Sequence, residues 1–117
     1  MTVATALDLA WASTDAALIA ASAVDRSGAV PDGLPIAVAR PTTVEQVQET
    51  VRVAAALGLV VVPRGAGTGM AGGALAGTGT LVVDLSALRS LSVDPVNRVA
   101  TAGAGVLTID VDEAARP

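Results

Sequence analysis

The pattern of apolar residues is clearest between residues 36 and 63, where it predicts a βαβ unit. Ile36–Ala39 and Leu59–Val62 are short apolar runs of the kind that form buried strands. Between them, apolar residues recur at helical spacing, and Gly58 stands just beyond the last of them, where many helices end. We therefore expect two parallel strands connected by a helix.

The helix of this unit has a predicted start and a predicted buried face. Two threonines precede it, each followed three residues later by Glu or Gln, which predicts a capping box at Thr42 or Thr43. Val44, Val47 and Val51 then repeat on one side. We expect these three valines to face the sheet.

Shorter elements are predicted on either side of this unit. Residues 4–22 are rich in Ala and Leu and fit a helix that Ser, Thr and Asp interrupt at positions 13–15. Prolines and glycines make residues 25–35 a loop. Beyond the unit we expect a buried strand at Thr80–Asp84, a β-hairpin around the turn Asp94–Asn97, and a helix that starts near Thr108.

The glycine-rich run Pro63–Gly73, which directly follows the second predicted strand, is the most informative segment for function. Glycines lack the Cβ atom that keeps a ligand away from the backbone, and they allow turns that point successive N–H groups inward. Ligands of open α/β sheets bind where strands end at their carboxyl side. We therefore predict an anion-binding loop in which the N–H groups of Gly65, Gly67 and Thr68 converge. The anion that such loops bind is most often a phosphate.

Composition restricts the chemistry that this chain can perform. Its 52% hydrophobic and 15% charged residues are typical of a folded core. That core is thin, because the sequence has one Trp and neither Phe nor Tyr. The absence of Cys, His and Lys excludes cysteine nucleophiles, Ser-His-Asp triads and Schiff bases. If the chain serves catalysis, a cofactor must carry the chemistry.

Charge and hydropathy exclude further classes of partner. A net charge of −4 argues against nucleic acid, which requires a positive face on the protein. The longest apolar stretch, Val53–Val62, is well short of the roughly 20 residues that a transmembrane helix requires. Because the N-terminus lacks a basic start and contains acidic residues, we expect no secretory signal and a cytoplasmic location.

Three kinds of phosphate loop compete for the glycine-rich run. A Walker A loop is excluded because it needs a lysine. Gly67-x-Gly69-x-x-Gly72, with Asp84 further on, matches the nicotinamide dinucleotide fingerprint in form, but that motif requires a helix to begin inside it. Each further glycine costs such a helix about 1 kcal/mol. A helix over residues 70–80 would favour nicotinamide, whereas an irregular loop would favour FAD.

Other polar residues have simpler structural interpretations. We interpret Asp84 as a cap or turn partner at its strand end and Trp11 as a packing anchor. The acidic residues near the C-terminus are interpreted as the solvated first turn of a helix, since acids favour that position; they are Asp110, Asp112 and Glu113.

Residues 36–107 resemble the FAD-linked oxidase family in several segments that follow in the family's order. The most specific is Pro63–Gly69, Pro-Arg-Gly-Ala-Gly-Thr-Gly, and Ala102–Val106, Ala-Gly-Ala-Gly-Val, is another. The nearest branch resembles the FAD-binding subunit of glycolate oxidase and the D-lactate dehydrogenases. The resemblance implies an α+β fold, the first lobe of a PCMH-type FAD-binding domain, in which a βαβ unit is followed by the glycine-rich loop, a strand and a β-hairpin.

The same resemblance implies which residues bind the cofactor. In that family this loop grips the pyrophosphate of FAD, and relatives that attach the flavin covalently have a His where Thr68 stands here, so FAD is expected to be non-covalent. Close approach of the ligand would depend on Gly72 and Gly73, and Arg64 would brace the loop or balance charge. The implied cofactor-binding residues are Pro63, Arg64, Gly65, Ala66, Gly67, Thr68, Gly69, Gly72 and Gly73.

The resemblance also implies that this chain is one part of a larger enzyme. We expect residues 1–35 to form an N-terminal helical and loop segment and residues 36–117 a partial FAD-binding domain, without the second lobe and the substrate cap. The implied substrate is a small 2-hydroxy acid such as glycolate or D-lactate, bound through those missing regions. We expect the isolated chain to bind FAD weakly or not at all and to show no dehydrogenase activity. The alternative is a non-functional truncated remnant.

Overall fold

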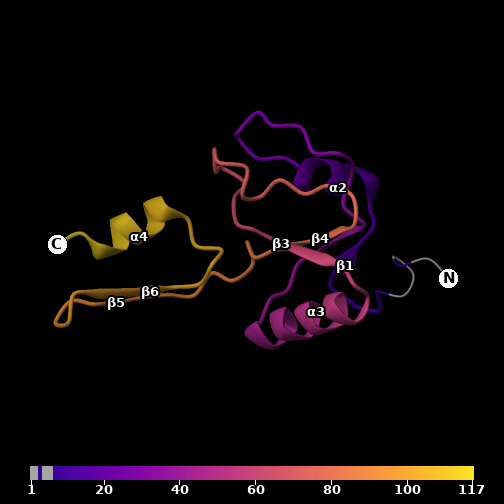
Figure 1. Ribbon diagram of the computed structural model, residues 1–117. Coiled ribbons are helices and arrows are strands. Elements are labelled where there is room, and N and C mark those ends of the chain that lie inside the picture. Colours follow the sequence, from indigo (N-terminus) through magenta and orange to yellow (C-terminus); the bar gives the residue numbers. More distant parts are fainter. Residues whose placement is uncertain (1–2, 4–6) are drawn as a thin grey trace.

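The computed structural model describes Val3 and residues 7–117, and its elements form two parts (Figure 1). The larger part is a four-stranded sheet with helices, and the smaller is a two-stranded ribbon beside a C-terminal helix. The two parts lie end to end, which gives the molecule extents of 54 × 32 × 20 Å. The predicted α+β class is confirmed.

The four-stranded sheet has the order β1-β2-β4-β3, with β1 at Ala12–Ser13, β2 at Ala37–Ala39, β3 at Val60–Arg64 and β4 at Thr80–Asp84. Strands β2 and β3 both run parallel to β4, and β1 pairs antiparallel with β2. The predicted βαβ unit is therefore present, but β4 is inserted between its two strands. Since β4 is central, its Leu81, Val82 and Val83 are buried, as expected for a strand covered on both faces.

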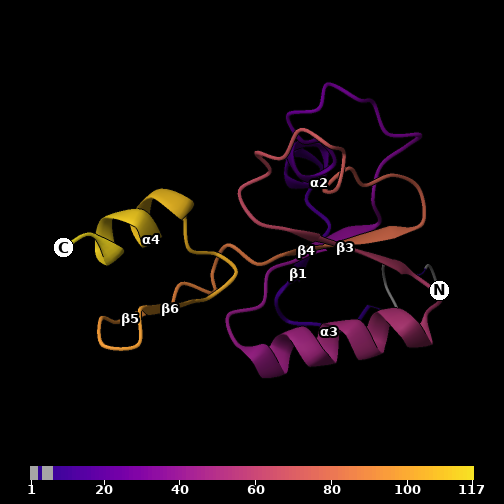
Figure 2. The ribbon, with the colours of Figure 1, turned by 60° about the vertical axis from the view of Figure 1, so that its left-hand side comes forward.

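Helix α3 (Val44–Ala56) covers one face of the sheet and α2 (Ala16–Ser22) covers the other (Figure 2). Two groups of buried side chains result. One contains Leu81 and Ala54 together with Leu7, Leu9, Ala37 and Ala39. The other contains Ile19, Val38, Ala76 and Val82. Mostly small aliphatic side chains fill both layers, so the core is thin, as the composition predicts.

The predicted capping of α3 is confirmed, with Thr43 as the N-cap. Its hydroxyl accepts a hydrogen bond from the Gln46 N–H at 3.1 Å, and the Gln46 side chain reaches back to accept one from the Thr42 N–H at 2.7 Å. At the other end Gly58 has a φ of +68°, the left-handed conformation expected just after a helix. The sequence signals therefore located both ends of this helix.

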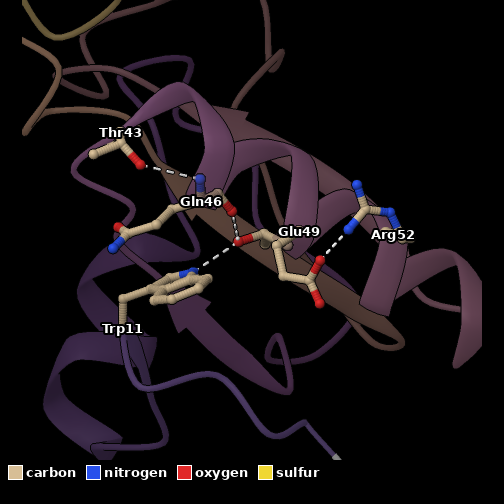
Figure 3. Close-up of polar contacts among 6 residues, drawn as sticks. Trp11, Thr43, Gln46, Glu49 and Arg52 are labelled. Carbon is tan, nitrogen blue, oxygen red and sulfur yellow. Dashed lines mark hydrogen bonds and ion pairs between the residues drawn. The ribbon is translucent and has the colours of Figure 1, made fainter.

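The predicted buried face of α3 is wrong in part. Val44 is 61% exposed and Val51 is 46% exposed, whereas Val47 is half-buried and Thr50 and Ala54 are buried. A hydrogen-bond chain explains the difference (Figure 3). The Trp11 indole N–H donates to the Thr50 hydroxyl at 2.8 Å, and that hydroxyl donates to the Gln46 carbonyl at 2.7 Å. Because its hydroxyl is paired, Thr50 can face the core at little cost.

The predicted N-terminal helix over residues 4–22 is shorter in the structure. Residues 4–6 lie outside the described residues, Ala12–Ser13 form strand β1, and the helix begins only at Ala16. Asp15 is its N-cap, since the carboxylate accepts a hydrogen bond from the Leu18 N–H at 2.9 Å. Asp15, which interrupts the helical pattern, therefore marks where the helix starts.

The smaller part contains the predicted hairpin and C-terminal helix. Strands β5 (Leu91–Asp94) and β6 (Val99–Ala102) pair antiparallel, and α4 spans Thr108–Ala115. The Asp94 carboxylate accepts hydrogen bonds from the N–H groups of Val96 and Asn97 in the turn. All of β6 is exposed, and α4 buries none of its residues. Among the described residues, no helix is long and apolar enough to cross a membrane.

Candidate functional site

The glycine-rich loop leaves β3 at the carboxyl edge of the three parallel strands and returns to their amino edge, where β4 begins. Residues 65–79 contain neither helix nor strand. The helix that the nicotinamide fingerprint requires after Gly67 is therefore not formed, and the match of Gly67-x-Gly69-x-x-Gly72 is one of sequence alone. The irregular loop expected for the FAD alternative is confirmed.

The first half of the loop, Gly65–Gly69, presents free backbone donors. Every residue of this segment except Gly67 is exposed, and Gly67 turns the backbone with a φ of +69°. Within the part of the chain that the structure describes, the N–H groups of residues 66–69 donate no hydrogen bond. Donors without a partner, in a loop with few Cβ atoms, suit an anionic ligand that approaches the backbone closely.

This half of the loop faces residues 104–109 across an open hollow. Ala66 and Thr68 line one side, and the segment Ala104–Ile109 lines the other, around a volume of about 330 Å³. A second hollow of about 390 Å³ shares Ala66 and residues 105–107 with the first. The N-terminus of α4 lies in this segment, and its N-cap, Leu107, makes no side-chain capping bond. The site therefore combines two sets of backbone donors.

The segment 104–109 belongs to the site but was not among the predicted site residues. Its position depends on two glycines that pack against the chain after β4. A Cβ atom on Gly103 would lie 2.4 Å from the Leu88 carbonyl oxygen, and one on Gly105 would lie 2.5 Å from the Leu85 carbonyl oxygen. The Gly105 N–H also donates to the Leu88 carbonyl at 2.8 Å. The sequence signal that could have predicted this segment was the pair Gly103 and Gly105, directly after a predicted strand.

Arg64 braces the loop, which is one of the two roles predicted for it; the other is to balance charge. Its guanidinium donates to the carbonyl groups of Val24 at 2.5 Å and Ser22 at 3.3 Å, which lie at the end of α2. It also fills the space beside Gly67, where a Cβ atom would lie 2.1 Å from a guanidinium nitrogen. Pro63 is exposed on β3, the edge strand of the sheet, a position that tolerates a residue without an N–H.

The second half of the loop has a different environment. Gly72 has a φ of +80°, and a Cβ atom on Gly72 or Gly73 would meet no atom within 4 Å. Here the backbone approaches Asp25 from the loop after α2. Hydrogen bonding with Ser27, and then with the N–H groups of Ala74 and Gly72, lowers the pKa of Asp25 from its ordinary value. The carboxylate of Asp25 is therefore ionised at neutral pH.

Asp84 has the surroundings of a turn partner, as interpreted from the sequence, whereas of the three acidic residues near the C-terminus only Asp110 lies in the first turn of α4. Asp84 accepts a hydrogen bond from the Ser86 N–H at 2.9 Å and pairs with Arg40 at 3.9 Å. Asp112 pairs with Arg116 along α4. No cluster of three or more Asp or Glu residues that could hold a metal ion occurs among the described residues.

Fold and site together define a class of protein, one that binds a phosphate-containing cofactor at the carboxyl edge of a small parallel sheet. Residues 35–117 match the FAD binding domain family. The chain belongs to this family, and its cofactor is FAD. The residues present fit the pyrophosphate of FAD, because the first half of the loop offers unpaired N–H groups and little side chain to keep it away.

Among curated proteins, the chain is 45% identical over 83 residues to D-2-hydroxyglutarate dehydrogenase of Xanthomonas citri pv. viticola, covering 70% of this chain and 18% of that protein. It is 38% identical over 84 residues to the glycolate oxidase subunit GlcD of Escherichia coli, covering 71% of this chain and 17% of that protein. The chain thus spans less than a fifth of the length of these relatives. The predicted resemblance to FAD-linked oxidases is confirmed.

Solved structures show the same fold. The crystal structure of 6-hydroxy-D-nicotine oxidase from Arthrobacter nicotinovorans superposes with a TM-score of 0.71 at 28% identity, covering 86% of this chain and 22% of that one. The chain is therefore an FAD-binding unit of the FAD-linked oxidoreductase type. Its relatives carry this unit as a small part of much longer chains.

Proposed function

We propose that this chain supplies the pyrophosphate-binding part of an FAD-dependent oxidoreductase whose substrate is a small 2-hydroxy acid such as glycolate or D-lactate. The observation that carries the proposal is the run of N–H groups at residues 66–69 without a partner in the described chain, opposite the N-terminus of α4. The substrate class is supported by the relatives, which are named for 2-hydroxyglutarate and glycolate.

The proposed roles follow from the surroundings of each residue. The backbone of Gly65–Gly69 contacts the phosphates and the ribityl chain, while Pro63 and Arg64 fix the start of the loop. Gly72 and Gly73 allow close approach of the backbone. Residues 104–109, in addition, form the opposite wall of the site. FAD binds without a covalent bond, since Thr68 stands where covalently flavinylated relatives have a His and the sequence has neither His nor Cys.

In this proposal bound FAD would supply the hydride-accepting chemistry, and the residues of this chain bind and orient the cofactor. The part of the chain that we describe contains no obvious general base, because the sequence has no His, Lys or Tyr. The substrate-handling groups are proposed to lie in a second flavin lobe and a substrate cap, outside residues 36–117. A cytoplasmic location remains a prediction from the sequence.

Two alternatives make different predictions. A nicotinamide-binding domain is disfavoured by the irregular conformation of residues 70–79. A remnant that binds no cofactor would keep the fold but not the affinity for FAD. The hollow of about 330 Å³ is near the lower limit of ligand pockets, and FAD is a large ligand. Weak binding by the isolated chain is therefore part of the proposal.

Titration of residues 1–117 with FAD, followed by flavin fluorescence, tests this function. We expect weak binding that Gly69→Val abolishes, because the substitution adds bulk within the segment whose N–H groups have no partner, while its Cβ atom would meet no protein atom within 4 Å. Ala71→Val, an exposed position in the same loop, is the matched control and should bind FAD as before. Submicromolar affinity would contradict the view that this chain forms only part of the FAD pocket. No binding at millimolar FAD would favour the alternative of a non-functional remnant.

A further inference from the structure

The glycine-rich loop and the wall at residues 104–109 offer a pyrophosphate backbone N–H groups, which carry only partial charges. The chain as a whole repels such a ligand at long range, since its net charge is −4. Asp110, in the first turn of α4, lines the hollow of about 390 Å³ and adds a negative charge beside these N–H groups. A pyrophosphate bound here therefore needs a cation.

Two arginines near the carboxyl edge of the sheet are already engaged elsewhere. Arg64 turns its guanidinium toward the carbonyl groups of Ser22 and Val24. Arg40, which directly follows β2, pairs with Asp84 at 3.9 Å. Neither arginine lines the two hollows beside the first half of the loop. The cation that balances the charge of the ligand must therefore come from another part of the chain.

Arg89, in the segment that connects β4 to β5, lines the hollow of about 390 Å³ together with Ala66 of the glycine-rich loop (Figure 1). Its Nε–H donates to the Ser86 carbonyl at 2.9 Å. The same carbonyl oxygen lies against Gly105, where an added Cβ atom would come within 2.6 Å of it. Arg89 is thereby held beside the wall at residues 104–109.

The far end of the Arg89 side chain is free to bind a ligand. The residue is exposed, and within the described chain its terminal nitrogens form neither a hydrogen bond nor an ion pair, Asp110 included. A guanidinium presents its N–H donors in a planar fork that matches the oxygens of a phosphate. Because Nε is already fixed, less side-chain freedom is lost when the terminal nitrogens bind.

We propose that Arg89 is the cation of the site: it binds the pyrophosphate of the cofactor beside the N–H groups of residues 66–69 and the wall at residues 104–109. This inference rests on the proposed function and adds to it a charged side chain from outside the glycine-rich loop. Arg89 is a binding residue whose charge offsets the negative charge of Asp110 and of the chain as a whole.

Titration of residues 1–117 with FAD, followed by flavin fluorescence, compares three variants with the wild-type chain. Arg89→Gln removes the charge and should weaken FAD binding about three- to tenfold, between the loss expected for an exposed ion pair and that for a hydrogen bond to a charged group. Arg89→Lys keeps the charge and should bind FAD more tightly than Arg89→Gln. Arg52→Gln, the matched control, removes the same charge from an exposed position on α3 and should bind FAD as the wild-type chain does.

Two results of this titration would overturn the inference and leave the proposed function intact. The first is equal FAD affinity of Arg89→Gln and Arg52→Gln, because the position of the charge would then not matter. The second is equal FAD affinity of Arg89→Gln and Arg89→Lys, because the effect would then not depend on charge.

If the wild-type chain binds no FAD, or if Arg89→Gln does not fold, NMR of the wild-type chain with inorganic pyrophosphate decides the question. The Nε–H resonance of Arg89 should shift together with the amide resonances of residues 66–69, while the Nε–H resonance of Arg52 stays in place. No shift at Arg89, or equal shifts at the two arginines, would overturn the inference. A response to pyrophosphate at Arg89 without any binding of FAD would count against the proposed function alone.

Discussion

Gly105→Ala is predicted to disrupt the wall of the site that faces the glycine-rich loop. The added Cβ atom would lie 2.5 Å from the Leu85 carbonyl oxygen and 2.6 Å from two backbone atoms of Ser86. Ordinary contacts begin at 3.4 Å, so backbone must move by about 0.9 Å, the difference from 2.5 Å. The same movement would strain the 2.8 Å hydrogen bond that the Gly105 N–H donates to the Leu88 carbonyl.

The magnitude follows from these two effects. Overpacking costs about 1–3 kcal/mol, and a weakened hydrogen bond costs about 1 kcal/mol, so we expect a loss of about 2–4 kcal/mol in the free energy of unfolding. For a domain of this size, at about 4 °C per kcal/mol, that lowers the melting temperature by about 8–16 °C. Thermal denaturation followed by circular dichroism measures the change.

Gly69→Ala is the matched control for this substitution. Its Cβ atom would meet no atom within 4 Å, and Gly69 has no left-handed φ. We therefore expect a change within about 0.5 kcal/mol. Equal melting temperatures for Gly105→Ala and Gly69→Ala would refute the packing argument and, with it, the assignment of residues 104–109 as a rigid wall of the site.

Three further predictions concern the fold and its pH dependence. Thr50→Val should lower the free energy of unfolding by about 1–2 kcal/mol, because the Trp11 N–H loses its acceptor; urea denaturation followed by the fluorescence of this single Trp measures it. Arg64→Met should cost about 1 kcal/mol through two lost bonds to carbonyl groups at the end of α2, whereas Arg52→Met, in an exposed ion pair (Figure 3), should change the same urea-derived value by less than about 0.5 kcal/mol. Hydrogen bonds, led by the Asn97 side chain in the same turn, lower the pKa of Asp94 below 3.8. The stabilisation by its carboxylate is therefore complete above pH 3.8 and is lost as the pH falls through the lowered pKa. In thermal denaturation, Asp94→Asn should lower the melting temperature less below pH 3.8 than at neutral pH.

Sequence signals located helices and turns well where capping and turn residues lie close together in the chain. The ends of α3 follow from the Thr43 cap and from Gly58, and the β5–β6 turn follows from the residues between Asp94 and Asn97. These features depend on contacts within a few residues. Local chemistry alone is sufficient to predict them.

Long-range contacts were the part that the sequence could not supply. The face of α3 is turned by the hydrogen bond between Trp11 and Thr50, which lie 39 residues apart, so apolar periodicity misplaced it. Insertion of β4 between β2 and β3 likewise has no local signal. The wall at residues 104–109 depends on how Gly105 packs against Leu85, a contact that only the folded chain creates.

Division of the glycine-rich loop into two halves was equally hidden in the sequence. Gly67, Gly69 and Gly72 look alike in the motif, yet the first two lie in the half whose N–H groups have no partner in the described chain, whereas Gly72 lies in the other half, where its carbonyl accepts a hydrogen bond from the Leu75 N–H. The difference comes from the segment after α2, whose loop composition predicts no particular contact. Fold family and cofactor were predictable from the motif, while the surroundings of each glycine were visible only in the structure.

The most direct test of the account is to map FAD on residues 1–117 by NMR. Addition of millimolar FAD should shift the amide resonances of residues 65–69 and 104–109, because both segments line the hollow and the N–H groups of residues 66–69 have no partner in the described chain. The amide resonance of Val82, in the buried strand β4, should stay nearly unchanged. Shifts confined to another surface, or no shifts in residues 65–69 at saturating FAD, would contradict the claim that this loop holds the pyrophosphate.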